Sequence, residues 1–133
     1  MEEKALQRHG WFRQCLAGLK EAKYRDPSDE FVQSGTVRKF CLTFDLSWKV
    51  MRDLARRQDP APDFIEASPR ECLKAAYDLE LIFDDRWYQM LSLRNALEQD
   101  YDGNLAAQSF DRIVKEYVPL FSAFAERAEG YLR

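Results

Sequence analysis

One short segment of the chain combines several kinds of polar side chain. It runs from Arg94 to Tyr101 and contains a guanidinium, two carboxamides, two carboxylates and a phenol. A planar guanidinium matches the geometry of phosphate oxygens, and carboxamides both donate and accept hydrogen bonds. Arg94, Asn95 and Gln99 are therefore candidates for binding a nucleotide or another phosphate ligand. The alternative is a polar helix end that frays into a loop and has no ligand.

A helix must position this segment, and the helical spacing of the apolar residues predicts one over residues 86–99. Asp84 is a plausible cap for its first turn. Arg94 and Tyr101 are seven residues apart, so they share one helix face if the helix continues that far. The main core candidates of this helix are Trp87, Met90, Leu91 and Leu97.

Two long helices are expected in the N-terminal half. The first covers residues 3–24 and ends before the Asp26-Pro27 pair, because the residue before a proline disfavours helix. The second covers residues 31–57 and has the most regular apolar stripe in the chain, so we expect it to be the central packing element. The core candidates of the first helix are Leu6, Phe12, Cys15, Leu16 and Leu19. Those of the second are Val37, Phe40, Cys41, Phe44, Trp48, Met51 and Leu54, with Arg38, Asp45, Lys49, Arg52 and Arg56 on its opposite face.

The remaining segments are a loop, a short helix and a long helix. Residues 58–63 are a loop by composition. Ser68-Pro69-Arg70-Glu71 is typical of a helix start, with a serine cap, a proline at the first position and a glutamate that returns the capping bond. This short helix should cover residues 69–79. The last helix should cover residues 105–132, with a kink at Pro119.

Composition points to one domain that spans residues 1–133. No segment alternates in the manner of a strand, so the fold class is all-α, an up-and-down bundle of about five helices. Hydrophobic residues make up 46% of the chain, enough to bury a core without metal or disulfide. The net charge is only -3, so any contact with nucleic acid needs a local patch.

Several function classes are disfavoured by the same composition. The chain has one histidine, His9, and therefore cannot build a multi-histidine metal site; we expect no metal and no cofactor. The three cysteines have no CxxC pair and are expected to be reduced thiols of a cytoplasmic protein. No apolar run approaches the roughly 20 residues of a membrane span, and the N-terminus lacks the apolar core of a signal peptide.

Four segments resemble motifs of one family, the nucleotidyltransferase substrate-binding proteins. FCLTFDLSWK at 40–49 resembles its F-x-x-x-F-[E/D]-L-x-W-K helix, and SPRECLKAA at 68–76 resembles its SPRE helix start. WYQMLSLRN at 87–95 is similar to its W-x-x-M-L-x-x-R-N helix, and DRIVKEYVP at 111–119 to its I-x-x-x-Y-x-P segment. The matches occur in order and cover most of the chain, from Phe40 to Pro119.

The resemblance implies a compact all-α protein of the HEPN superfamily. It further implies a homodimer with two copies of Arg94 facing one another, and the cleft between them as the candidate site for a nucleotide or RNA. It implies a partner, a small separate nucleotidyltransferase. Some members are ribonuclease toxins that the partner neutralises as antitoxin, and others are substrate-binding subunits of the transferase.

The ribonuclease members carry an arginine, a histidine a few residues later, and a tyrosine that accepts nucleotidyl groups. Arg94 and Asn95 match the start of this motif and Tyr101 matches the tyrosine, but Gln99 stands where the histidine belongs. A glutamine amide does not titrate near neutrality, so it cannot replace the histidine as a proton carrier.

Two interpretations stay open besides that of a purely structural interaction domain whose polar helix end has no ligand. The first, which we favour, is a non-catalytic, degenerate HEPN partner subunit of a transferase, either alone or in a toxin–antitoxin pair. It would help to present the substrate of the transferase or be that substrate itself, with Tyr101 as nucleotidylation acceptor. The second is a ribonuclease toxin in which Glu98 or Asp100 serves as the base. For Tyr101 the alternative is an aromatic side chain that packs on the last helix.

Overall fold

The computed structural model describes residues 2–58 and 67–132, and within them every regular element is a helix. Two short segments are not α-helical. A 3₁₀ turn, η1, follows α1 directly, and a π-helical segment, η3, lies between α5 and α6. The elements are α1 (Glu2–Lys20), η1 (Glu21–Tyr24), α2 (Glu30–Gln58), α3 (Pro69–Asp78), α4 (Arg86–Leu97), α5 (Asn104–Arg112), η3 (Ile113–Tyr117) and α6 (Val118–Leu132). The predicted all-α bundle is confirmed. None of the described helices is both long and apolar enough to cross a membrane.

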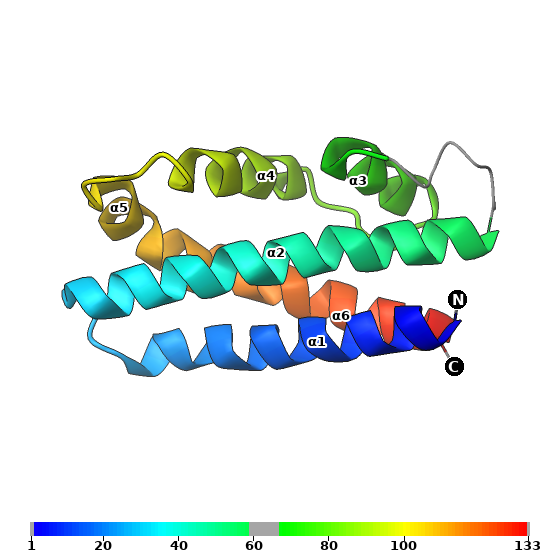
Figure 1. Cartoon of the computed structure of the whole chain (residues 1–133), viewed down its shortest axis with the longest axis horizontal. Coiled ribbons are helices and arrows are strands. Elements are labelled where there is room, and N and C mark those ends of the chain that lie inside the picture. Colours follow the sequence, from blue (N-terminus) through cyan, green and yellow to red (C-terminus); the bar gives the residue numbers. More distant parts are fainter. Residues whose placement is uncertain (1, 59–66, 133) are drawn as a thin grey trace.

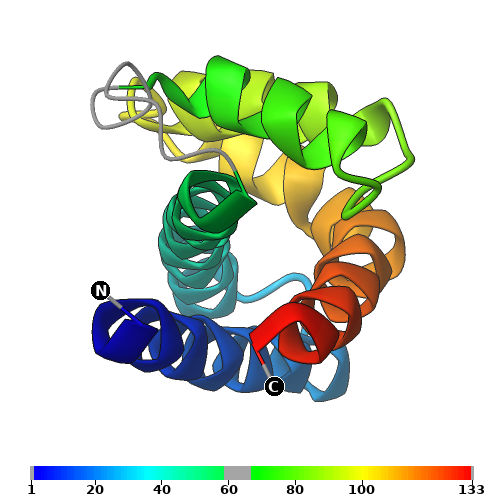
Figure 2. The same ribbon diagram turned by 90° about the vertical axis from the view of Figure 1, so that its right-hand side faces the viewer.

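Helix α2 is the centre of the bundle. It runs the length of the molecule, with α1 and α6 on one side and α3 and α4, placed end to end, on the other (Figure 1). In the end-on view α2 and α6 lie between α1, below them, and α3 and α4, above them (Figure 2). Helix α2 packs against α1, α3, α4, α5 and α6. The sequence prediction that this helix is the central packing element is confirmed.

The core between these helices is rich in aromatic side chains. Trp87 of α4 makes edge contacts with Phe121, at 5.5 Å between ring centroids, and with Phe124, at 5.7 Å. Phe40 of α2 stacks on Tyr117 at 5.8 Å. Each such aromatic pair stabilises the fold by about 0.5–1.5 kcal/mol beyond its area burial. The aromatic contacts therefore link α4 to α6, and α2 to η3.

Together α1 and η1 cover the range predicted for the first helix, but the prediction that Leu6 belongs to the core was wrong. Leu6 is 52% exposed. The buried stripe of α1 consists of Ala5, His9, Phe12, Leu16 and Leu19, which follow one another at helical steps of three or four residues. Leu6 directly follows Ala5 and therefore points about 100° away from that stripe. Burial follows the stripe even though it places an alanine and a histidine inside.

Helix α3 begins as its sequence predicts. The Ser68 hydroxyl accepts a hydrogen bond from the Glu71 backbone N–H at 3.2 Å, and the Glu71 carboxylate accepts one from the Ser68 N–H at 3.2 Å. This is a complete capping box with Pro69 in the first turn. The helix ends at Asp78, and two residues later Glu80 adopts a left-handed conformation with φ 61°. The loop predicted at 58–63 lies outside the described residues except for Gln58, which ends α2.

The C-terminal helix is irregular one turn before its proline. The Val118 N–H bonds to the Ile113 carbonyl, five residues back, which makes Ile113–Tyr117 a π-helical turn. A proline ring clashes with the carbonyl four residues earlier, here that of Lys115, and a widened turn relieves this clash. The predicted single helix over 105–132 is thus divided into α5, a π-helical segment and α6, and this irregularity lies upstream of the proline. The kink at Pro119 itself stays a prediction.

Candidate functional site

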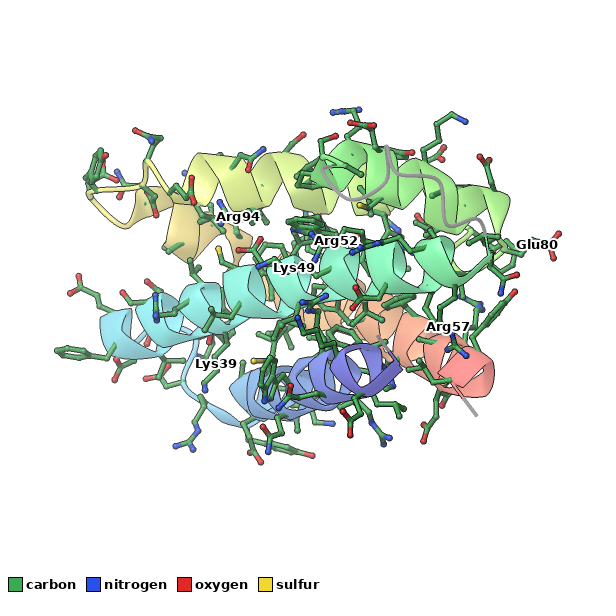
Figure 3. The ribbon with its side chains drawn as sticks, turned by 45° about the vertical axis from the view of Figure 1, so that its right-hand side comes forward. Lys39, Lys49, Arg52, Arg57, Glu80 and Arg94 are labelled. Carbon is green, nitrogen blue, oxygen red and sulfur yellow. The ribbon has the colours of Figure 1, made fainter. Side chains whose placement is uncertain are left out.

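The segment singled out by sequence lies where α4 ends beside α2. The Arg94 guanidinium points across the interface at Asp45 and not into solvent (Figure 3). Its Nε donates to Asp45 Oδ1 at 2.8 Å and one terminal nitrogen, Nη2, donates to Asp45 Oδ2 at 2.8 Å. The other terminal nitrogen, Nη1, pairs with Glu98, one turn further along α4. The side chains of Arg94 and Asp45 are only 20% and 28% exposed.

This geometry determines the charge of the site. A fork-to-fork arginine–carboxylate pair is the strongest and most directional form of ion pair. The hydrogen bonds to Asp45, and secondarily those to Glu98, raise the pKa of Arg94 above its ordinary value. The two carboxylates outnumber the one guanidinium, and an anionic ligand at Arg94 has to displace Asp45 or Glu98. The local positive patch that phosphate binding needs is absent around this arginine within the described chain.

The helix ends before it reaches the other predicted site residues. Helix α4 stops at Leu97, so Gln99 and Tyr101 lie in the turn that leads to α5, and Tyr101 does not share a helix face with Arg94. Asn95 and Gln99 are both exposed. The Tyr101 hydroxyl donates to the Gln99 side-chain oxygen at 3.3 Å. The structure thus brings Gln99 and Tyr101 together, and holds Arg94 in a separate interaction.

The turn that carries Tyr101 is held by the start of the next helix. The Asp100 carboxylate accepts the backbone N–H of Leu105 at 3.0 Å and that of Ala106 at 2.8 Å. Free N–H groups at the first turn of a helix are satisfied by such a carboxylate. Tyr101 itself is 87% exposed, which is inconsistent with the alternative that its ring packs on the last helix. The result is a fixed turn with an accessible phenol.

No proton-transfer group is assembled beside Arg94 in residues 2–58 and 67–132. Both acids that were considered as bases already have partners: Glu98 pairs with Arg94, and Asp100 caps α5. His9 is 6% exposed on α1, and α1 packs on α2 and α6. Burial, together with Arg13, lowers the pKa of His9 below its ordinary value. Burial also raises the pKa of the nearby Cys41 thiol to about 11, so this cysteine is not a thiolate nucleophile at neutral pH.

Several residues that the sequence analysis weighed are structural. Phe44 is fully buried in the core, and Trp48 is half-buried beneath Lys49 and Arg52, each 5.6 Å from its ring centroid. Asp84 accepts the Arg86 backbone N–H at 2.9 Å. The N-cap position of α4 is nevertheless Asp85, which makes no side-chain capping bond, so the prediction that Asp84 caps this helix was wrong by one residue. No cluster of three or more metal-binding side chains occurs among the described residues.

Sequence reasoning missed the partner of Arg94. Asp45 was placed on the outer face of its helix, among four basic residues, because the stripe pattern of α2 alone does not show which helix covers that face. A signal was nevertheless available. Asp45 and Arg94 both belong to the motifs that the chain shares with one family, and motif positions of opposite charge on two helices are candidates for an ion pair.

The fold and the site define a class of protein: an all-α bundle in which an arginine of α4 joins two helices and an exposed tyrosine lies in the turn that follows. The family model described as "Nucleotidyltransferase substrate binding protein like" matches residues 7–130, and the chain belongs to this family. No curated protein matches the chain with significant similarity. The family suspected from the four sequence motifs is thus confirmed.

Proposed function

We propose that this chain is the partner subunit of a small nucleotidyltransferase and that it binds, or itself provides, the substrate of that enzyme. The observation that carries the proposal is family membership over residues 7–130. The geometry supports a non-catalytic role, because Arg94 is paired with Asp45 and the motif histidine is replaced by Gln99. We further propose a cytoplasmic homodimer of the HEPN type that acts with the transferase as a two-component, toxin–antitoxin-like pair.

Tyr101 is the proposed acceptor of the transferred nucleotide. Its phenol is 87% exposed, in a turn that Asp100 anchors to α5, so a second protein can reach it without unfolding a helix. In the reaction the Tyr101 oxygen forms a bond to the α-phosphorus of a nucleoside triphosphate, and the bond between that phosphorus and the bridging oxygen breaks. Pyrophosphate leaves, and the phenolic proton passes to a base of the transferase.

Association with the transferase is tested by copurification. The protein and the small transferase encoded next to it are coexpressed, with an affinity tag on one of them, and complex formation is measured by size-exclusion chromatography with light scattering. We expect a stoichiometric complex that contains two copies of this chain. No association at about micromolar concentration, well within the range of specific protein complexes, would contradict the proposal.

Modification of Tyr101 is tested with labelled nucleoside triphosphates. The transferase, Mg²⁺ and each triphosphate in turn are incubated with wild-type protein, with Tyr101→Phe and with Tyr24→Phe. Tyr24 is a matched control because it is also an exposed tyrosine, at 73% exposure. We expect label on wild type and on Tyr24→Phe, and none on Tyr101→Phe. Equal labelling of all three proteins would assign the acceptor elsewhere.

A further inference from the structure

The outer side of α4 carries a groove that the Arg94 segment does not use. Its volume is about 510 Å³, and its lining residues come from α3, from α4 and from the α5–α6 helix near its π-helical turn. A smaller depression of about 430 Å³ shares two of these residues, Arg70 and Tyr88. The two lining arginines come from opposite ends of α4, since Arg70 belongs to α3 and Arg112 ends α5, and these helices lie beyond the two ends of α4 (Figure 1).

Arg70 is held in place without using its hydrogen-bond donors. Its guanidinium lies over the ring of Tyr88, at 5.4 Å from the ring centroid, and Tyr88 in turn stacks on Tyr77 at 6.3 Å. A cation–π contact orients a guanidinium through its flat face and leaves the N–H groups at its edge. Among residues 2–58 and 67–132, Arg70 has no carboxylate partner. Its donors are therefore available to an anion.

The π-helical turn builds the opposite wall. Arg112 and Tyr117 are five residues apart and would diverge on a regular α-helix. A π-helix forms its hydrogen bonds between residues five apart, so such residues come to the same side of the helix. Both line the groove. The acidic neighbour of Arg112, Glu116, is 3.8 Å away, and this exposed contact is long for an ion pair.

The middle of the groove is suited to a planar, partly apolar group. Leu93 and Ala96 provide apolar surface, and Gln89 and Ser92 provide an amide and a hydroxyl on the same face of α4. Of the described residues that line the groove, none is acidic, and two are arginines. This is a local excess of positive charge on a chain with a net charge of -3. Charge and shape together favour an anion with an attached planar ring.

We propose that this groove binds a nucleoside phosphate. Arg70 binds the phosphate oxygens, Arg112 supplies the second positive charge, and the base lies on Leu93 and Ala96, where Gln89 and Ser92 bond to its edge. Arginine forks on phosphate and amides on base edges are the recurrent chemistry of nucleotide recognition. The same chemistry is offered by a free nucleotide and by the phosphorylated end of an RNA strand. The inference goes beyond the proposed partner role and does not require the transferase.

The test titrates the full-length protein alone, by calorimetry, with AMP, adenosine, ribose 5-phosphate and a short 5′-phosphorylated RNA. We expect AMP to bind at least tenfold more tightly than adenosine or ribose 5-phosphate, because the groove contacts both the phosphate and the base. Comparison of AMP with the RNA separates the two sources. AMP that binds as tightly as the RNA indicates a free nucleotide, and tighter RNA binding indicates a strand end; either result supports the proposal.

Matched variants locate the binding. Arg70→Gln should weaken AMP binding about tenfold, the loss expected for one charge-assisted hydrogen bond. Arg127→Gln is its control, because Arg127 also lies over an aromatic ring, Phe83 at 4.7 Å, but does not line the groove. Ala96→Trp should abolish binding by filling the groove, and Ala107→Trp, on an exposed site of α5, should leave it unchanged.

Three results would overturn the inference. They are the absence of saturable AMP and RNA binding at about 1 mM, equal effects of the groove variants and their controls, and a change in oligomeric state, instead of affinity, with Ala96→Trp. The last result would identify the groove as a contact between copies of the chain. None of these results bears on association with the transferase, which the copurification experiment tests separately.

Discussion

The two sides of helix α4 carry arginines in opposite situations. On the side that faces α2, Arg94 is mostly buried and bonded to Asp45 by two hydrogen bonds of 2.8 Å. On the outer side, Arg70 of α3 is held over the Tyr88 ring without a carboxylate partner in the described chain. The comparison shows that an arginine in a family motif is not by that fact an anion site. An arginine can bind an anionic ligand only where a carboxylate of the chain does not already occupy its hydrogen-bond donors.

The largest expected effect concerns the paired side. Asp45→Ala removes both fork bonds and leaves the Arg94 guanidinium, which is 20% exposed, with Glu98 alone. We expect the free energy of unfolding to fall by about 2 kcal/mol, because a partly buried charge loses its partner. Urea denaturation measures it. The control is Asp78→Ala, which removes the exposed Lys74–Asp78 pair; a similar loss for both variants would mean that the α2–α4 pair is not special.

A medium effect is expected at the helix that carries Arg70. Ser68→Ala removes the acceptor of the Glu71 N–H and half of the capping box of α3. Loss of a serine cap costs about 1 kcal/mol. Because α3 positions Arg70, this variant should also weaken AMP binding, whereas Asp45→Ala should not. Thermal unfolding and calorimetry check both parts, and unchanged stability would show that the cap is not important for α3.

A smaller effect is expected on the pH dependence of stability, and it comes from the buried His9 side chain. His9 is 6% exposed, and neither ring nitrogen has a hydrogen-bond partner in the described part of the chain. Burial lowers its pKa in the folded state, so below the unfolded-state value of about 6.5 the unfolded chain binds more protons than the folded one. Stability should therefore fall as pH decreases below about 6.5, down to the folded-state pKa.

Denaturation midpoints of wild type and of His9→Gln, measured between about pH 5 and 8, test this linkage. Glutamine has no titrating group, so the variant should lose this part of the pH dependence. Parallel curves for the two proteins would show that His9 does not contribute. The charged neighbours of His9 on α1 and α6, Arg13 and Glu129, are the same in both proteins.

The smallest expected effect is on RNA. Because Arg94 is paired and Gln99 cannot carry a proton, purified wild-type protein should cleave RNA no faster than Arg94→Ala does, and both should equal the buffer control. A labelled RNA incubated with each protein and separated on a denaturing gel gives the answer. Cleavage by wild type that disappears in Arg94→Ala would favour the ribonuclease toxin instead.

Much of the fold follows from local sequence. The apolar stripe of α2 predicts its length and central place, and Ser68 with Glu71 predicts the start of α3 almost to the residue. Features that depend on neighbouring helices were not predictable in this way. The end of α4 at Leu97 and the π-helical turn before Pro119 result from packing and from a carbonyl clash, and neither has a distinctive sequence period.

The site was predicted in part. The segment from Arg94 to Tyr101 contains the residues of interest, but periodicity does not show that α2 lies against α4, and so it did not reveal the Asp45 pair. The groove is less predictable still. Arg70, Tyr88 and Arg112 come from three helices, and only the folded chain brings them to one surface.

One measurement tests the contrast between the two arginines most directly. AMP is titrated side by side into wild-type protein, Arg94→Ala and Arg70→Gln. Because Arg94 is already paired with Asp45, we expect Arg94→Ala to bind AMP within about twofold of wild type. Because Arg70 is proposed to bind the phosphate, we expect Arg70→Gln to bind AMP about tenfold more weakly. The opposite order, with affinity lost in Arg94→Ala and retained in Arg70→Gln, would contradict it.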